Sequence, residues 1–128
     1  MIAHIAMGSV AALLFGSCTA SAQTGDAAMG EGVFANRCKA CHEVANEKAK
    51  EGQGPSLKGL FGRTAGSVPG FAYSDAMKAA GFTWDEDKLK AYLINPKALV
   101  PNNKMVFNGL KREGEMENLI AYLKEATK

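Results

Sequence analysis

Residues 38–42, CKACH, place two thiols and an imidazole within five positions. Residues of these types support four kinds of chemistry: a disulfide, a redox-active dithiol, a metal site, or a haem attached through both sulfurs. The choice between them depends on the other cysteines and histidines of the chain and on the elements that hold the motif.

The chain has the composition of one globular domain. It contains 128 residues, with 15 Lys and Arg against 13 Asp and Glu, and 47% of the residues are hydrophobic. This balance excludes a disordered chain, and the length is enough for one domain and too short for two. No basic run is interleaved with aromatic residues, so we expect no nucleic-acid binding.

Residues 1–22 differ from the rest because they contain no Lys, Arg, Asp or Glu and end in the small residues ASA. Their apolar stretch is short for a membrane span, and the ASA end fits signal peptidase. We therefore predict a signal peptide cleaved before Gln23 and a periplasmic domain at 23–128, although the usual positive start is missing. An uncleaved anchor and a lipid attached at Cys18 are the alternatives.

Once the signal is removed, every cysteine and histidine of the chain lies in CKACH. A structural zinc ion needs four nitrogen or sulfur ligands, and these three are too close together to surround it. A thioredoxin-like dithiol would follow a strand of a βαβ unit, and the flanking sequence has no such alternation. A disulfide is compatible with an oxidising compartment, but it gives His42 no role.

Haem attachment uses all three residues. The thiols of Cys38 and Cys41, one helical turn apart, would form thioethers with the two haem vinyl groups, and His42 would reach the iron from the same side. A covalently held porphyrin would also supply apolar surface that so short a chain with long loops lacks.

Helical periodicity accounts for most of the regular structure, and no alternating segment predicts a strand. Residues 52–70 carry six glycines and two prolines and are predicted as loop. Four helices are expected: after a cap at Asp26, over 74–81 with Ser74 as cap and Gly81 as stop, from Asp85 to before Pro96, and around Met116, Leu119, Ile120 and Leu123.

From Gly30 to Lys128 the order of motifs resembles mitochondrial-type (class I) cytochrome c and its bacterial periplasmic relatives. The matching stretches are CKACH, GPSLKGLFGR, PGFAYSDAMK, TWDEDKLKAYLINPK, PNNKMVF and LIAYLKEATK. The resemblance implies an all-α, single-domain fold whose helices and long loops wrap around one covalent haem c. It also implies that Gly30 and Phe34 of the first helix cross Leu119 and Tyr122 of the last.

Met105 is the expected second axial ligand. PNNKMVF has no helical period, which places Met105 on a loop, and the axial methionine of the family lies at this point of the same motif. Other methionines have the ordinary role of filling gaps in the core, and Met29 and Met116 fit helix faces. Ligation by His42 and Met105 raises the reduction potential and leaves one-electron transfer as the chemistry.

The resemblance also assigns residues around the haem. The Pro55 carbonyl is expected to accept a hydrogen bond from His42, and the Tyr92 hydroxyl is expected to point at the Met105 sulfur. Three residues match those that serve a buried haem propionate: Arg63, Tyr73 and Trp84. For the aromatic residues, simple core packing is the alternative.

Two positions depart from the family pattern. Met77 stands where an asparagine is usual near a buried water, so the resemblance does not carry that hydrogen-bond network over to this chain. Asn103 replaces the usual threonine two residues before the expected ligand, so the resemblance does not carry the threonine's contact with a propionate over to this chain.

Basic residues crowd the segments expected around the haem edge, and we call this set the basic rim: Arg37, Lys39, Lys97, Lys104, Lys111 and Arg112. They are interpreted as a docking face for acidic partners, with ordinary solubilising surface as the alternative. The expected partners are a quinol-oxidising cytochrome c reductase as donor and a terminal oxidase or photosynthetic reaction centre as acceptor.

We therefore predict a soluble, monomeric one-electron carrier that is not an enzyme. Two other functions stay open on the sequence. One is a small peroxidase-like haem enzyme in which Met105 dissociates, and the other is a dedicated electron acceptor for one periplasmic dehydrogenase.

Overall fold

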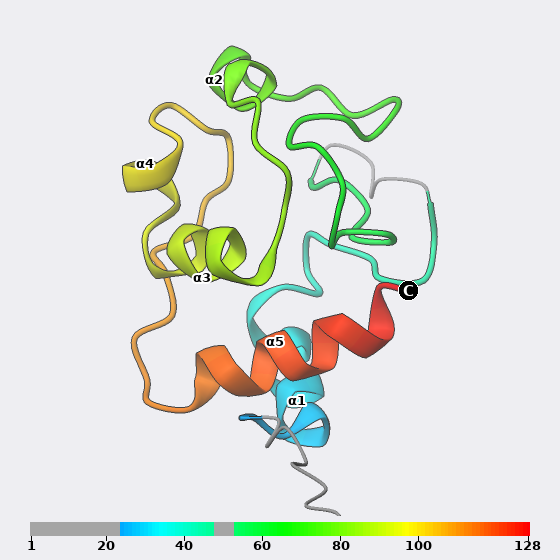
Figure 1. The fold of residues 1–128 in the computed structure, drawn as a ribbon, viewed down its shortest axis with the longest axis vertical. Coiled ribbons are helices and arrows are strands. Elements are labelled where there is room, and N and C mark those ends of the chain that lie inside the picture. The colour runs from blue at the N-terminus through cyan, green and yellow to red at the C-terminus, as the bar shows by residue number, and fades with distance from the viewer. Residues whose placement is uncertain (1–23, 48–52) are drawn as a thin grey trace, which may run out of the picture.

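The computed structural model describes residues 24–47 and 53–128, so the predicted signal peptide lies outside the described residues. Long irregular segments join the helices of this part, as Figure 1 shows. The helices are α1 (Ala27–Arg37), α2 (Asp75–Ala79), α3 (Glu86–Ile94), α4 (Pro96–Leu99) and α5 (Glu115–Ala126). Within the described ranges the β pairing is limited to an isolated bridge between Thr64 and Thr83. The predicted all-α fold is confirmed.

The first three helices begin at side-chain caps, of which the sequence predicted Asp26 and Ser74 as caps and Asp85 as the start of its helix. Carboxylate or hydroxyl oxygens of Asp26, Ser74 and Asp85 accept hydrogen bonds from first-turn backbone N–H groups at 2.7–3.1 Å. Such caps satisfy donors that have no partner inside the helix.

None of the helices in the described part is both long and apolar enough to cross a membrane.

The short helix α4 was not predicted. Pro96 correctly marks the end of α3, but it is also the first residue of α4, where its fixed φ and missing N–H are tolerated. Asn95 caps this turn, its side-chain oxygen accepting from the Ala98 N–H at 3.2 Å. The Asn-Pro pair is a helix-start signal that could have found it.

The most extensive contact between helices is the crossing of α1 and α5, which lie across each other in Figure 1. Gly30 and Phe34 are the buried residues of α1, and Leu119 of α5 is fully buried. The rings of Phe34 and Tyr122 lie 5.5 Å apart between centroids. The crossing that the resemblance implied is therefore present. The CKACH motif follows directly from the end of α1, one of the two crossing helices.

Met29 is 62% exposed, although its place on a helix face predicted that it would fill a gap in the core. That expectation was wrong because the buried face of α1 is narrow and centred on Gly30 and Phe34. The neighbouring position therefore turns toward solvent.

A cluster of charges joins α3 to α5. The Glu86 carboxylate, at the start of α3, pairs with Lys124 of α5 and with Lys90 at 2.8 Å. Hydrogen bonds from these two lysines, Lys124 first, lower the pKa of Glu86 to about 2. Because this pKa is lowered, the ion pairs stabilise the fold above pH 4.5 and are lost as the pH falls toward 2.

We predict opposite effects for two glycine substitutions in α1. A Cβ added at Gly30 would overlap the Asn118 carbonyl oxygen and lie 2.8 Å from the Tyr122 Cβ, whereas one added at Gly32 meets no atom within 4 Å. Gly30→Ala should lower the free energy of unfolding of the haem-loaded protein by about 1–3 kcal/mol. Gly32→Ala should raise it by about 0.5–1 kcal/mol.

Guanidinium chloride unfolding of both variants, followed by circular dichroism, measures these changes. A Gly30→Ala protein as stable as the Gly32→Ala protein would contradict the close helix crossing.

Candidate functional site

The CKACH motif continues from the end of α1 as a hydrogen-bonded turn. The N–H groups of Cys38 and Lys39 both donate to the Phe34 carbonyl at 2.9 Å. The N–H groups of Cys41 and His42 then donate to the Cys38 carbonyl at 3.0 and 2.9 Å. Cys38 is partly buried, Cys41 is exposed, and no disulfide joins them. The two thiols are thus held close together in a hydrogen-bonded turn that follows α1.

His42 is oriented by the loop that follows. Its Nδ1 lies 2.9 Å from the Pro55 carbonyl oxygen, as the resemblance implied. A carbonyl only accepts, so Nδ1 carries the hydrogen and Nε2 keeps its lone pair. Burial lowers the pKa of His42, although the Pro55 bond acts in the opposite direction. The imidazole is therefore neutral near pH 7, the form that binds a metal.

Gly54 lets this loop approach the imidazole. A Cβ at this position would lie 2.6 Å from the Cys41 carbonyl oxygen and 2.8 Å from the His42 Cε1. Sequence reasoning gave Gly54 no role in the site. The Gly-Pro pair that follows CKACH was the available signal, because glycine permits close approach of the backbone.

A cavity of about 390 Å³ lies between the CKACH motif and the Met105 loop. Its volume falls in the range of small-molecule and cofactor pockets. Buried and half-buried apolar residues from distant segments form its walls: Leu57, Leu60, Phe71, Met77, Leu89, Leu93, Phe107, Leu119 and Leu123. Met77 thus packs as a core residue beside the cavity.

Every site residue predicted from the sequence lines this one cavity: Cys38, Cys41, His42, Pro55, Arg63, Tyr73, Trp84, Tyr92 and Met105. The set spans most of the described chain, so the fold brings together residues that lie far apart in sequence. Two thiols, a neutral imidazole and a thioether facing one apolar cavity fit a haem bound through the sulfurs and two axial ligands.

The three residues expected to serve a propionate are already packed. Arg63 donates from Nη1 to the Lys58 carbonyl at 2.7 Å, and the Tyr73 hydroxyl accepts from the Val68 N–H at 3.1 Å. Burial lowers the pKa of Arg63 and raises that of Tyr73. Their contact with a propionate stays a prediction, and so does that of Trp84.

Tyr92 stands beside Trp84, with ring centroids 5.1 Å apart. Burial raises the pKa of Tyr92 to about 12, so its hydroxyl is protonated and able to donate. Within the described part of the chain, no hydrogen bond joins that hydroxyl to the Met105 sulfur. The expected bond between them stays a prediction.

Two members of the basic rim make specific contacts at the cavity. Arg37 donates from Nη2 to the Gly109 carbonyl at 3.3 Å, and its guanidinium lies 5.6 Å from the centroid of the Phe107 ring. Lys104 donates to the Ala72 carbonyl at 2.8 Å, which links the Met105 loop to the segment before α2. Both cations therefore also hold loops in place.

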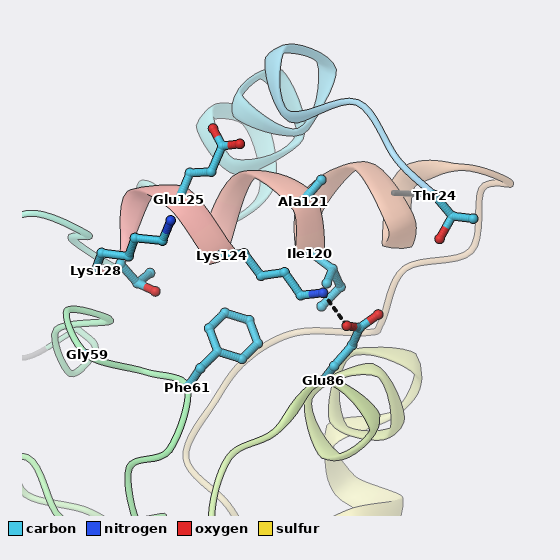
Figure 2. A pocket seen from close by; sticks show the side chains of 10 residues that line it. Thr24, Gly59, Phe61, Glu86, Ile120, Ala121, Lys124, Glu125 and Lys128 are labelled. Carbon is cyan, nitrogen blue, oxygen red and sulfur yellow. Dashed lines mark ion pairs between the residues drawn. The ribbon is translucent and has the colours of Figure 1, made fainter. Parts of the chain in front are cut away.

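A larger hollow of about 860 Å³ lies beside α5, and Figure 2 shows its charged side chains around Phe61. It is lined by Lys124, Lys128, Glu86 and Glu125, and Lys124 and Glu86 pair with each other. Among the described residues, no cysteine, histidine or methionine lines it. The smaller cavity, which holds the residues able to bind a cofactor, is therefore the candidate site.

Comparison with known proteins gives one consistent family. The family model described as Cytochrome c matches residues 27–127. The chain is 54% identical to cytochrome c of Chlamydomonas reinhardtii over 108 residues, which cover 84% of this chain and 96% of the relative. It is 51% identical to cytochrome c-550 of Nitrobacter winogradskyi over 104 residues, which cover 81% and 94% of the two chains.

Proposed function

The chain belongs to the cytochrome c family, whose members carry electrons on a covalently attached haem c. From this we propose which residues of this protein hold the haem and with which partners the protein exchanges electrons. When bound, the haem supplies an iron that gains and loses one electron. Everything else in the proposal concerns the side chains of this protein.

In this proposal Cys38 and Cys41 would carry the thioether bonds, His42 would bind the iron through Nε2, and Met105 would bind it through sulfur. The observation that carries it is the single apolar cavity on which the CKACH motif and Met105 both border. The bond from His42 Nδ1 to Pro55 supports the assignment of Nε2, because it leaves only that nitrogen free for a metal.

Electron carriage without catalysis follows from this ligand set. A neutral thioether favours iron(II), so the pair of His42 and Met105 favours a high reduction potential. With His42 and Met105 both holding the iron, the protein would leave no position on it for a substrate. We therefore propose a carrier and not an enzyme, and the peroxidase-like alternative would require Met105 to leave.

The partners of this carrier are proposed from charge. The basic rim supports docking to acidic surfaces, and its members Lys97, Lys111 and Arg112 are exposed. We propose a quinol-oxidising cytochrome c reductase as donor and a terminal oxidase or photosynthetic reaction centre as acceptor, both served by a monomer. A carrier dedicated to one dehydrogenase would instead accept electrons from a single donor.

The proposed location is the periplasm, with residues 1–22 removed and Gln23 as the first residue of the mature chain. The apolar stretch and its ASA end support this, and so does the likeness to a bacterial cytochrome c-550. The intact mass of the mature protein tests it, since a retained, acylated Cys18 would contradict it.

Met105→Ala tests the ligand set. Loss of the sulfur should open one axial position, so the reduced haem-loaded variant should bind carbon monoxide and its reduction potential should fall. Axial-ligand identity acts over a range of about 0.8 V, so the fall should be large. Absorption spectra with and without carbon monoxide, together with redox titration, measure both effects.

Met77→Leu is the matched control, because Met77 is a buried core residue whose volume leucine nearly conserves. It should keep the original spectrum and potential. Should Met105→Ala also keep them and stay inert to carbon monoxide, Met105 is not the ligand and the carrier mechanism is wrong.

Lys97→Glu tests the basic rim. Lys97 is exposed on α4, and the charge reversal should slow association with an acidic redox partner about 10-fold at low salt. The effect should fade near 0.1 M salt, where the Debye length is about 10 Å. Stopped-flow electron transfer with an isolated reductase, measured across ionic strengths, gives the rates.

Lys128→Glu makes the same charge change at an exposed lysine that lines the hollow of Figure 2 and not the haem cavity. It should leave the rate close to that of the wild type. Equal slowing by both variants would show that net charge, and not the basic rim, governs association.

A further inference from the structure

The loop that carries Met105 contains an asparagine whose side chain is used entirely within the loop. Asn103 is 6% exposed. Its Oδ1 accepts a hydrogen bond from the Met105 N–H at 2.9 Å, and its Nδ2 donates to the Val100 carbonyl at 2.7 Å. One amide group therefore joins the end of α4 to the proposed ligand itself.

The loop has little other structure of its own. Residues 100–110 form no regular element, and Asn102 takes a left-handed backbone conformation with φ 63°. Ordering such a segment costs conformational entropy, which local hydrogen bonds must offset. An asparagine that bonds the backbone two residues onward is a recognised way to fix a turn. At Asn103 the bonded residue is Met105, so the turn sets where the methionine side chain leaves the backbone.

At its far end the loop is held by hydrogen bonds from Arg37 to the Gly109 carbonyl and from the Leu110 N–H to the Leu93 carbonyl. Next to Met105, the side-chain contact besides those of Asn103 runs from Lys104 to Ala72, and its exposed ammonium group can exchange the carbonyl for water. The Asn103 hydrogen bonds are buried or partly buried. A buried donor or acceptor left without a partner costs more free energy than an exposed one, which water can satisfy. Asn103 is thus the stronger of the two side-chain restraints next to Met105.

We propose that Asn103 is a positioning residue that keeps Met105 directed into the cavity and so suppresses its replacement by an outside ligand. This inference rests on the proposed ligation by Met105. It assigns a role to a residue that sequence analysis identified only as a departure from the family pattern. Asn103 acts through Met105 and takes no part in binding the outside ligand.

Imidazole added to the oxidised, haem-loaded protein is a suitable probe, because it competes with Met105 for the same position. Its apparent affinity scales with the fraction of molecules in which the methionine is displaced. Asn103→Ala removes both hydrogen bonds, each of which changes such an equilibrium by a few-fold. Imidazole should therefore bind the variant about 10-fold more tightly than the wild type.

Two further variants complete the test. Asn103→Ser keeps a side-chain oxygen that makes the same turn more weakly, so it should bind imidazole with an intermediate, about 3-fold, gain. Asn103→Ser also tests the inference on its own if the Asn103→Ala variant does not fold. Asn108→Ala removes an exposed asparagine from the same loop and should match the wild type.

The sulfur-to-iron charge-transfer band of the oxidised wild type is recorded first. Without that band, the ligand assignment fails and this inference fails with it. With the band present, an unchanged imidazole affinity in Asn103→Ala and Asn103→Ser overturns the inference alone, even if guanidinium unfolding shows lower stability. Graded affinities in the order alanine, serine, wild type support it.

Discussion

The hydrogen bond from His42 to the Pro55 carbonyl is the interaction on which the site depends. At 2.9 Å it fixes the imidazole tautomer and leaves Nε2 directed away from the loop. The same bond connects the CKACH motif to the segment after Pro55, whose residues Arg63 and Tyr73 line the cavity. Gly54 makes this approach possible, since a side chain there would overlap the Cys41 carbonyl and the imidazole.

The CKACH side and the Met105 side of the cavity differ in how firmly the rest of the fold holds them. The CKACH side rests on the crossing of α1 and α5, where Gly30 brings the helix backbones together and Leu119 is fully buried. The Met105 side is an irregular loop held by the Asn103 turn. Motion at the site should therefore concentrate on the methionine side, so ligand exchange there depends on local restraints and not on the helix core.

Local signals in the sequence predicted much of the fold. Asp26 and Ser74 cap the helices they were expected to cap, and the next helix starts at Asp85 as expected, because capping depends on residues only two or three positions apart. Gathering the site residues around one cavity required the family resemblance. Gly54 and Asn103 were not given their roles, because these depend on what lies opposite each residue in space. The exposure of Met29 was missed because periodicity gives a face and not its width.

The central claim is that the haem iron has protein ligands on both sides and so only carries electrons. The most direct measurement is the absorption spectrum of the reduced wild-type protein before and after carbon monoxide is added at neutral pH. We expect no change, because Met105, as the proposed ligand, would hold the position that carbon monoxide needs. Rapid conversion to a carbon monoxide-bound spectrum would contradict it and would favour the peroxidase-like function.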